Sequence, residues 1–284
     1  MYAEFLKEIN SELPDGVDWK QGARDYLKKC LPNVEDRWPL YLVPFGLVQD
    51  TTLRLFYNFL NIMDLLRVPE KSRFIDVGCG SGWLAHFIAK YGHYSLGIDL
   101  CEDFIKIARE RADEDRFYPK NGFAKAEFVT HDLEAGPLRT NELFDVAILE
   151  SSLHHFLDPV LAIKHLSESL KQDGIIIVLE GQKPPKDSDC DQVGKAEMAR
   201  YKTLERAYTR EQMIRVFQLA GYSHHRFVIP INGFFDEDEL IRNDCRNLYK
   251  YIWGHNNIVA SRSELKCFPA SSSATSPSPS PTSP

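Results

Sequence analysis

Two aspartates on either side of a glycine-rich turn are the residues of this sequence whose chemistry is most specific. Gly78, Gly80 and Gly82 interrupt an apolar run, and Asp99 follows the first glycine by 99 − 78 = 21 positions. Glycines lack a Cβ, so backbone N–H groups can approach a ligand closely at the start of a helix. A carboxylate at the end of the next strand can accept hydrogen bonds from both hydroxyls of a ribose. The spacing therefore indicates a ligand that contains a nucleoside.

Other residues of the turn narrow the choice of nucleoside. A dinucleotide fingerprint needs glycine at position 83, where Trp83 stands, and the Gly-Lys-Ser/Thr of a phosphate loop is absent. Asp76, two residues before the first glycine, would repel a pyrophosphate and would attract an ammonium group. An adenosine that carries a methionine tail with a sulfonium satisfies both Asp76 and Asp99.

The turn requires a strand before it and a helix after it, and the sequence supplies both. Residues 74–77 are a short apolar run, residues 83–90 carry apolar side chains at helical spacing, and residues 94–98 are a second apolar run. Such a strand–helix–strand unit builds a parallel sheet with helices on its faces. The sequence thus predicts an α/β fold.

Asp76-Val77-Gly78-Cys79-Gly80-Ser81-Gly82, followed by Gly97-Ile98-Asp99, resembles the first two motifs of class I S-adenosylmethionine-dependent methyltransferases. The resemblance implies a Rossmann-like, seven-stranded, mostly parallel sheet with one antiparallel strand, helices on both faces and S-adenosyl-L-methionine as cofactor. It assigns a set of cofactor-binding residues: Asp76, Gly78, Cys79, Gly80, Asp99, Leu100, Asp132, Leu133 and Glu150. Among these, the resemblance implies that Asp132 binds the amino group of adenine and that Leu133 flanks its ring. The alternatives are a generic nucleotide-binding turn and a strand–helix junction without a ligand.

The remaining elements are predicted from apolar spacing, caps and turns. The expected strands are 126–130, 143–149, 175–180, 222–229 and an antiparallel 257–262, and the expected helices are 18–31, 49–66, 101–111, 159–170, 196–206 and 209–220. Asp173-Gly174 is expected to form a tight turn before the fifth strand.

We expect a helical lid over residues 1–70, with Tyr41 or Phe45 facing the substrate. The methyltransferase domain would span 71–263, with cap insertions at about 183–208 and 230–255, and the Ser/Pro-rich 264–284 is predicted to be disordered.

Two adjacent histidines follow the fourth strand. In open α/β sheets ligands bind beyond the carboxyl ends of the strands, so His154 and His155 should face the transferable methyl group. The Leu-His-His…Asp-Pro pattern resembles that of small-molecule methyltransferases. Histidine titrates near neutral pH, so one of the pair is predicted to be a general base, with His131 a weaker candidate. The alternative is that a histidine of the pair bonds to the backbone and shapes the loop.

Composition limits the partners. The net charge is −7 and the isoelectric point about 5.7, which disfavours nucleic-acid binding. The six cysteines form no C-x-x-C pair, so we expect free thiols and no metal. The aliphatic run 175–179 is too short to span a bilayer, and the first residues do not resemble a signal peptide, so a cytoplasmic protein is expected. The insertion at 230–255 is expected to cap the substrate pocket, and the alternative is that it forms a homodimer contact.

These features together predict transfer of a methyl group to an oxygen of a small molecule by in-line displacement, with nitrogen and carbon acceptors left open. Glu150-Ser151-Ser152-Leu153 replaces the Asn/Asp-Pro-Pro-aromatic motif of enzymes that methylate amide or exocyclic amine nitrogens. The alternatives are a cofactor-binding regulator or pseudoenzyme, a methyltransferase for a macromolecule, and an aminopropyl transferase that uses Glu150 as its base.

Overall fold

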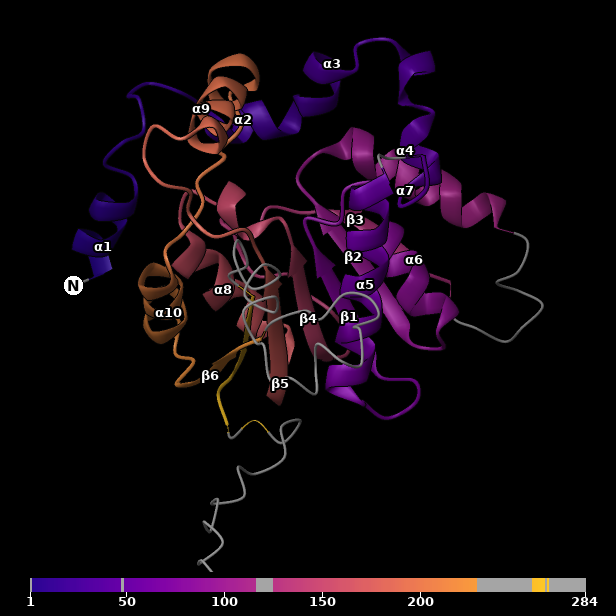
Figure 1. Cartoon of the computed structure of the whole chain (residues 1–284). Coiled ribbons are helices and arrows are strands. Elements are labelled where there is room, and N and C mark those ends of the chain that lie inside the picture. The colour runs from indigo at the N-terminus through magenta and orange to yellow at the C-terminus, as the bar shows by residue number, and fades with distance from the viewer. Residues whose placement is uncertain (1, 47–48, 116–124, 229–256, 264, 266–284) are drawn as a thin grey trace, which may run out of the picture.

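A computed structural model describes residues 2–46, 49–115, 125–228, 257–263 and 265 (Figure 1). A seven-stranded sheet forms the centre, in the order β3-β2-β1-β4-β5-β7-β6. The strands are β1 (Arg73–Val77), β2 (Tyr94–Asp99), β3 (Glu127–Thr130), β4 (Phe144–Glu150), β5 (Leu170–Leu179), β6 (His224–Phe227) and β7 (Ile258–Ser261). Strand β7 runs antiparallel to both of its neighbours, and the other pairs are parallel. The predicted seven-stranded Rossmann-like fold with one antiparallel strand is confirmed.

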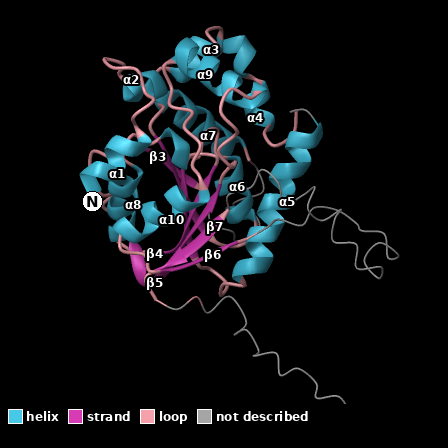
Figure 2. Ribbon diagram, turned by 60° about the vertical axis from the view of Figure 1, so that its left-hand side comes forward, coloured by secondary structure: helices cyan, strands magenta, loops and turns pink. Residues whose placement is uncertain are grey.

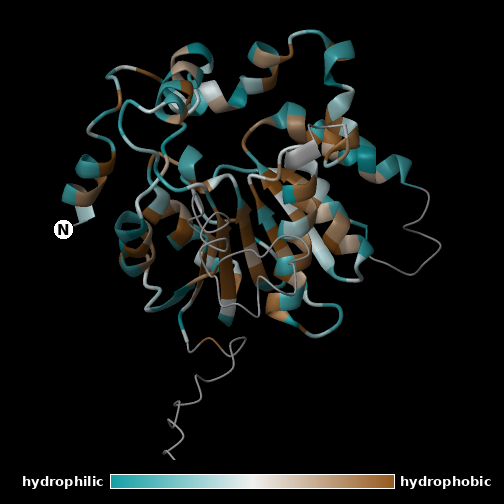
Figure 3. Cartoon of the chain, viewed as in Figure 1, coloured by the Kyte–Doolittle hydropathy of each residue, from teal (hydrophilic) through white to brown (hydrophobic). Residues whose placement is uncertain are grey.

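Helices cover both faces of the sheet (Figure 2). One face carries α1 (Tyr2–Ile9), α8 (Pro159–Glu168) and α10 (Arg210–Leu219), and the other carries α5 (Gln49–Leu66), α6 (Trp83–Lys90) and α7 (Glu102–Glu114). Because side chains alternate along a strand, Ile75 packs toward the first face and Phe74 toward the second. The central strands are accordingly apolar on both faces, as Figure 3 shows in brown.

Capping residues fix where several helices begin. The Asp158 side chain accepts a hydrogen bond from the Leu161 N–H at the start of α8, and Pro159 occupies the first turn. Thr209 and Gln212 form a capping box at the start of α10. None of the helices among the described residues is long and apolar enough to cross a membrane.

Three predicted element boundaries are wrong. The helix expected over 18–31 is divided at Asp25 into α2 (Trp19–Arg24) and α3 (Tyr26–Cys30), because the backbone of Asp25 leaves the helical region at φ −97° and ψ 8°. The helix expected over 196–206 is α9 (Asp189–Tyr201), which starts earlier because Ser188 caps it. Asp173-Gly174 lies inside β5, where the pairing with β4 shifts register.

The first 70 residues take several positions around the sheet. Helices α1 and α5 pack on its opposite faces, whereas α2 and α3 lie beyond the carboxyl ends of the strands, beside α9 (Figure 1). In the sequence between α3 and α5 lie the 3₁₀ turn η1 (Val34–Arg37) and α4 (Pro39–Leu42). The predicted insertion 230–255 lies outside the described residues. Of the predicted tail 264–284, the structure describes Leu265 alone, which is buried on the α5 side of the sheet.

Candidate cofactor and acceptor site

The glycine turn and the end of β2 are joined by backbone hydrogen bonds. The N–H groups of Gly78 and Cys79 both donate to the carbonyl of Ile98, at 2.8 and 3.0 Å. The Asp99 carboxylate accepts from the N–H of Gly80 at 2.9 Å and from that of Cys101 at 2.8 Å. Burial raises the pKa of Asp99, while these backbone bonds oppose the shift. Asp99 is therefore held rigidly beside the turn, at the end of its strand.

Gly78 and Gly80 both have positive φ, but their surroundings differ. Gly78 has φ +70°, and a Cβ there would lie 2.5 Å from the Cβ of Ser152. Gly80 has φ +51°, but a Cβ there would meet nothing within 4 Å. The backbone at Gly78 is thus packed against the loop after β4, whereas the backbone at Gly80 faces open space.

A cavity of about 270 Å³ adjoins the carboxyl ends of β1, β2 and β4. It is lined by eight of the residues predicted from the sequence: Gly78, Gly80, Asp99, Leu100, His131, Asp132, Leu133 and His155. Four predicted residues are not among the lining residues: Asp76, Cys79, Glu150 and His154. Tyr41 and Phe45, expected to face the substrate, do not line it either: the Tyr41 hydroxyl bonds Glu110, and Phe45 packs against Phe56.

Asp76 lies buried in the sheet next to the cavity, with 2 % of its surface exposed. Its Oδ2 has no hydrogen-bond partner. Burial, and then the nearby Glu150 carboxylate, raise the pKa of Asp76 to about 8. Glu150 itself accepts hydrogen bonds from Arg54 and Asn58 of α5, at 3.3 and 3.2 Å. Asp76 is therefore mostly protonated at neutral pH, and a cation close by would restore its charge.

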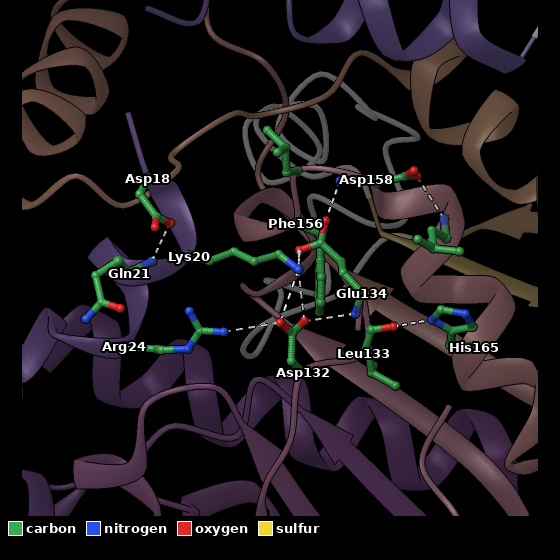
Figure 4. Close-up of polar contacts among 12 residues, drawn as sticks. Asp18, Lys20, Gln21, Arg24, Asp132, Leu133, Glu134, Phe156, Asp158 and His165 are labelled. Atoms are coloured by element: carbon green, nitrogen blue, oxygen red, sulfur yellow. Dashed lines mark hydrogen bonds and ion pairs between the residues drawn. The ribbon is translucent and has the colours of Figure 1, made fainter. Parts of the chain in front are cut away.

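Asp132, the acid predicted to bind adenine, is already bound by two cations of α2 (Figure 4). Lys20 Nζ lies 3.2 and 3.1 Å from its two oxygens, and an Arg24 nitrogen lies 3.5 Å from Oδ2. Lys20 also pairs with Glu134 at 3.5 Å. Ion pairs thus connect helix α2 to the loop after β3, at the predicted adenine end of the cavity.

The two histidines have different environments. His154 Nδ1 lies 2.7 Å from Glu180, and its Nε2 lies 3.3 Å from Glu205. Burial alone would lower the pKa of His154, but Glu180 and then Glu205 outweigh it and raise the pKa to about 10. Glu180 also accepts the N–H of Leu153 at 2.7 Å, so it fixes η2 (Leu153–His155). His154 is therefore a cation held between two carboxylates.

His155 lies on the cavity wall. Its Nδ1 is 2.5 Å from the carbonyl of Leu204, and since a carbonyl only accepts, this nitrogen carries the proton. Loss of hydration, followed by the neighbouring His154 charge, lowers the pKa of His155 to about 4. The ring is neutral at pH 7, and its Nε2 carries a lone pair. Of the two predicted catalytic histidines, only His155 lines the cavity and can accept a proton.

His154, His155 and Glu205 each present one potential metal-ligating atom within 4.8 Å of the others, the one such cluster among the described residues. The bonds of His154 to two carboxylates and of His155 to Leu204 account for this arrangement without an ion.

Several lining residues had no motif to mark them. Trp19, Lys20 and Tyr26 come from α2 and α3, and Thr203 and Glu205 come from the segment after α9. The only sequence signal for the first group is the apolar and aromatic spacing within residues 18–31, which predicts a helix and no site. For Thr203 and Glu205 the only indication was their place in the predicted 183–208 insertion.

The described residues suit S-adenosylmethionine. Asp99 ends β2 where a ribose would lie, Leu100 and Leu133 give apolar walls, and the open space at Gly80 leaves the turn accessible. The unpartnered Oδ2 of Asp76 is the acceptor that a nearby ammonium group would complement.

Comparisons with known proteins agree with this geometry. A family described as "Methyltransferase domain" matches residues 75–178. The chain is 29% identical over 100 residues to the ubiquinone biosynthesis O-methyltransferase of Coxiella burnetii, covering 35% of this chain and 39% of that protein. The chain thus matches about two fifths of the length of that curated relative.

Solved structures share the fold at low identity. Magnesium protoporphyrin IX methyltransferase from Synechocystis PCC 6803, with bound SAH, superposes with a TM-score of 0.57 at 17% identity, covering 86% of this chain and all of that one. Phosphoethanolamine N-methyltransferase 2 from Haemonchus contortus, in complex with S-adenosyl-L-methionine, gives 0.60 at 17% identity, covering 89% of this chain and 62% of that one. Residues 75–178 are therefore similar to a methyltransferase domain, within a chain that has the Rossmann-like fold of these solved methyltransferases.

Proposed function

We propose that this protein is an S-adenosylmethionine-dependent methyltransferase that acts on a hydroxyl oxygen of a small molecule. The observation that supports this most is the composition of one cavity. Its adenosine-binding features, Asp99 and the Gly78–Gly80 turn, and a neutral histidine, His155, line the same space. A protein that only bound the cofactor would not need a proton acceptor there.

The cofactor supplies an electrophilic methyl group on a sulfonium. The protein residues hold the two reactants in line, an arrangement that can account for about 7–11 kcal/mol of a barrier. Nε2 of His155 would take the proton of the acceptor hydroxyl, so that its oxygen could receive the methyl group that the bound cofactor would supply. The Leu204 carbonyl keeps the other ring nitrogen protonated, which leaves Nε2 free to accept.

His154 has a different part in this proposal. It is already protonated at neutral pH, because two carboxylates bind it, so it is a positioning residue and not the base. By ion pairing it connects Glu180, at the end of β5, with Glu205, after α9. This contact holds the loop that carries His155.

Oxygen is favoured over nitrogen for two reasons. A hydroxyl acceptor needs a base, and His155 is available as one. The curated relative named above is an O-methyltransferase by its name. The lining residues contain few basic groups, Lys20 being already paired with Asp132 and Glu134, which favours a small molecule over a nucleic acid.

The test uses S-adenosylmethionine with a radiolabelled methyl group. The purified protein is incubated with a cell extract separated by ultrafiltration into small molecules and macromolecules. We expect label in the small-molecule fraction, at an oxygen by mass spectrometry. Asp99→Ala should abolish incorporation and cofactor binding, whereas Asp113→Ala, at an exposed acid of α7, should change neither. Label in macromolecules only, or cofactor binding without transfer to any fraction, would overturn the proposal.

A further inference from the structure

Thr203 lies in the segment after α9 and lines the same cavity as Asp99 and His155. Only 4% of its surface is exposed, and its Oγ1 has no hydrogen-bond partner among the described residues. A buried hydroxyl has lost its bonds to water, so leaving it without a partner destabilises the fold. A ligand in the cavity that completed the bonding of this hydroxyl would explain why it is there.

The backbone on both sides of Thr203 is held in place. The Lys202 carbonyl packs so closely on α2 that a Cβ at Gly22 would overlap its oxygen. The Leu204 carbonyl accepts the Nδ1–H of His155 at 2.5 Å. Thr203 is thus next in sequence to the residue that orients the base, and its backbone cannot shift without breaking these contacts.

Ser151, immediately after β4, supplies a second hydroxyl to the same cavity. Its φ is +52°, a left-handed conformation that residues other than glycine rarely adopt. A hydrogen bond from its N–H to the Leu179 carbonyl of β5, at 2.9 Å, holds it there. The side chain is exposed, and its hydroxyl is bonded to none of the residues that the structure describes. Backbone strain of this kind is concentrated at functional sites, so the strain at Ser151 indicates a role in the site.

Two other donors of the cavity are already bonded within the protein. The Gly80 N–H donates to Asp99, and the Ser152 hydroxyl donates to the Val77 carbonyl at 2.7 Å. The two hydroxyls described above can therefore bind a ligand without giving up a bond to the described part of the chain. Neither belongs to a predicted cofactor-binding residue. Each is connected to His155, one through the next residue of the chain and the other through the loop after β4.

We propose that Thr203 and Ser151 bind the methyl acceptor, and that the acceptor is a mainly apolar molecule with an oxygen in addition to the hydroxyl that is methylated. This inference rests on the proposed function and adds acceptor-binding residues and a substrate class. Trp19 and Phe156 line the same cavity and would pack against the apolar part. Ligand sites commonly combine apolar walls with a few polar groups that fix orientation. The second oxygen would complete the bonding of the two hydroxyls and hold the first oxygen beside Nε2 of His155.

Three single substitutions test the two hydroxyls. Thr203→Val and Ser151→Ala each remove one hydroxyl and keep a Cβ. Ser95→Ala is the matched control, because the Ser95 hydroxyl is also buried without a partner among the described residues but does not line the cavity. Since Thr203→Val and Ser95→Ala each remove an unpartnered buried hydroxyl, both should unfold at no lower a temperature than the wild type. A lower unfolding temperature in Thr203→Val would show that its hydroxyl serves the fold, and would overturn its assignment.

The probe is the small-molecule fraction of a cell extract, used at a series of dilutions with radiolabelled S-adenosylmethionine. The dilution that gives half of the maximal rate measures acceptor binding before the acceptor is identified. We expect Thr203→Val and Ser151→Ala each to need extract that is about tenfold more concentrated, and Ser95→Ala to match the wild type. The dissociation constant for S-adenosylhomocysteine, measured by calorimetry, should be the same in all three variants. Mass spectrometry should find an unmethylated oxygen in the labelled product.

The outcomes separate this inference from the function on which it rests. If the wild type labels no small molecule, the proposed function fails. If it does, and both variants follow the wild-type dilution curve, the acceptor-binding residues are wrong and the methyltransferase stands. A change in one variant alone supports that residue and overturns the other. Weaker binding of S-adenosylhomocysteine would place the hydroxyls on the cofactor and overturn the inference, and a product with a single oxygen, or a methylated sugar, would overturn the substrate class.

Discussion

Lys20 of α2 binds both carboxylate oxygens of Asp132, at 3.2 and 3.1 Å. The Arg24 side chain and the Glu134 N–H bind the same carboxylate, at 3.5 and 3.0 Å. The acceptor predicted for the adenine amino group is thus used by the protein itself (Figure 4). A cofactor that donates to Asp132 must share it with Lys20 or displace that side chain.

Replacing Lys20 by Met should therefore tighten the binding of S-adenosylhomocysteine. The lysine is partly exposed, and ion pairs of this kind contribute about 0–1 kcal/mol, so the expected gain is at most about fivefold. Calorimetry measures it, with Lys28→Met as a control because Lys28 pairs with Asp25, away from Asp132. Weaker binding in Lys20→Met would show that Lys20 holds the cofactor and does not compete with it.

Removing the base should separate turnover from binding. His155→Ala is expected to lower kcat by about 10²- to 10⁴-fold with little change in cofactor affinity. Since the pKa of His155 is lowered to about 4, the wild-type rate should not fall between pH 7 and pH 5.5 through this group. An acid limb near pH 6.5 that disappears in His155→Ala would contradict the assigned pKa, and an unchanged kcat would remove the assignment of the base.

His154 should stabilise the folded protein more at low pH than at high pH. Its pKa is about 10 in the folded protein and near 6.5 in an unfolded chain, so folding favours the protonated form. The resulting stabilisation is complete below pH 6.5 and is lost as pH rises toward 10. The difference in unfolding free energy between wild type and His154→Gln, from urea titrations, should shrink from pH 6 to pH 9.5. A difference that is constant over this range would contradict the ion pair with Glu180.

Gly78→Ala should destabilise the fold as well as the site. The new Cβ would have to lie 2.5 Å from that of Ser152, in a backbone with φ +70°. Strain of this kind costs about 1–3 kcal/mol, and the steric overlap adds to it. Ser152 cannot move freely, since it is buried and its hydroxyl donates to the Val77 carbonyl at 2.7 Å. Thermal unfolding tests this, with Gly136→Ala as the control because a Cβ there meets nothing within 4 Å.

Much of the sheet and of the glycine turn could be predicted from the sequence, because local signals determine them. The glycine turn, the acid at the end of β2 and the capping box at Thr209 each depend on residues close together in the chain. Helix boundaries were less predictable: α2 ends where the backbone of Asp25 leaves the helical region, and α9 begins at a side-chain cap by Ser188, and apolar spacing reveals neither.

The roles within the histidine pair could not be predicted, because they depend on partners from distant segments. Glu180 lies 26 positions after His154, and Leu204 lies 49 positions after His155. Two neighbours in sequence thus have pKa values shifted in opposite directions, that of His154 raised to about 10 and that of His155 lowered to about 4. The raised pKa of Asp76 also depends on a distant segment, since the nearby Glu150 belongs to β4.

The place of β7 has a consequence for how the protein is made. Strand β7 lies between β5 and β6 and pairs Val178 with Ile258, across 80 positions of sequence. While a ribosome is still adding the residues that form β7, the edge of β5 has unpaired backbone groups beside an aliphatic surface. A nascent chain of this kind is expected to need a chaperone until its last strand emerges, and a premature stop before residue 257 should direct the product to aggregation or proteolysis.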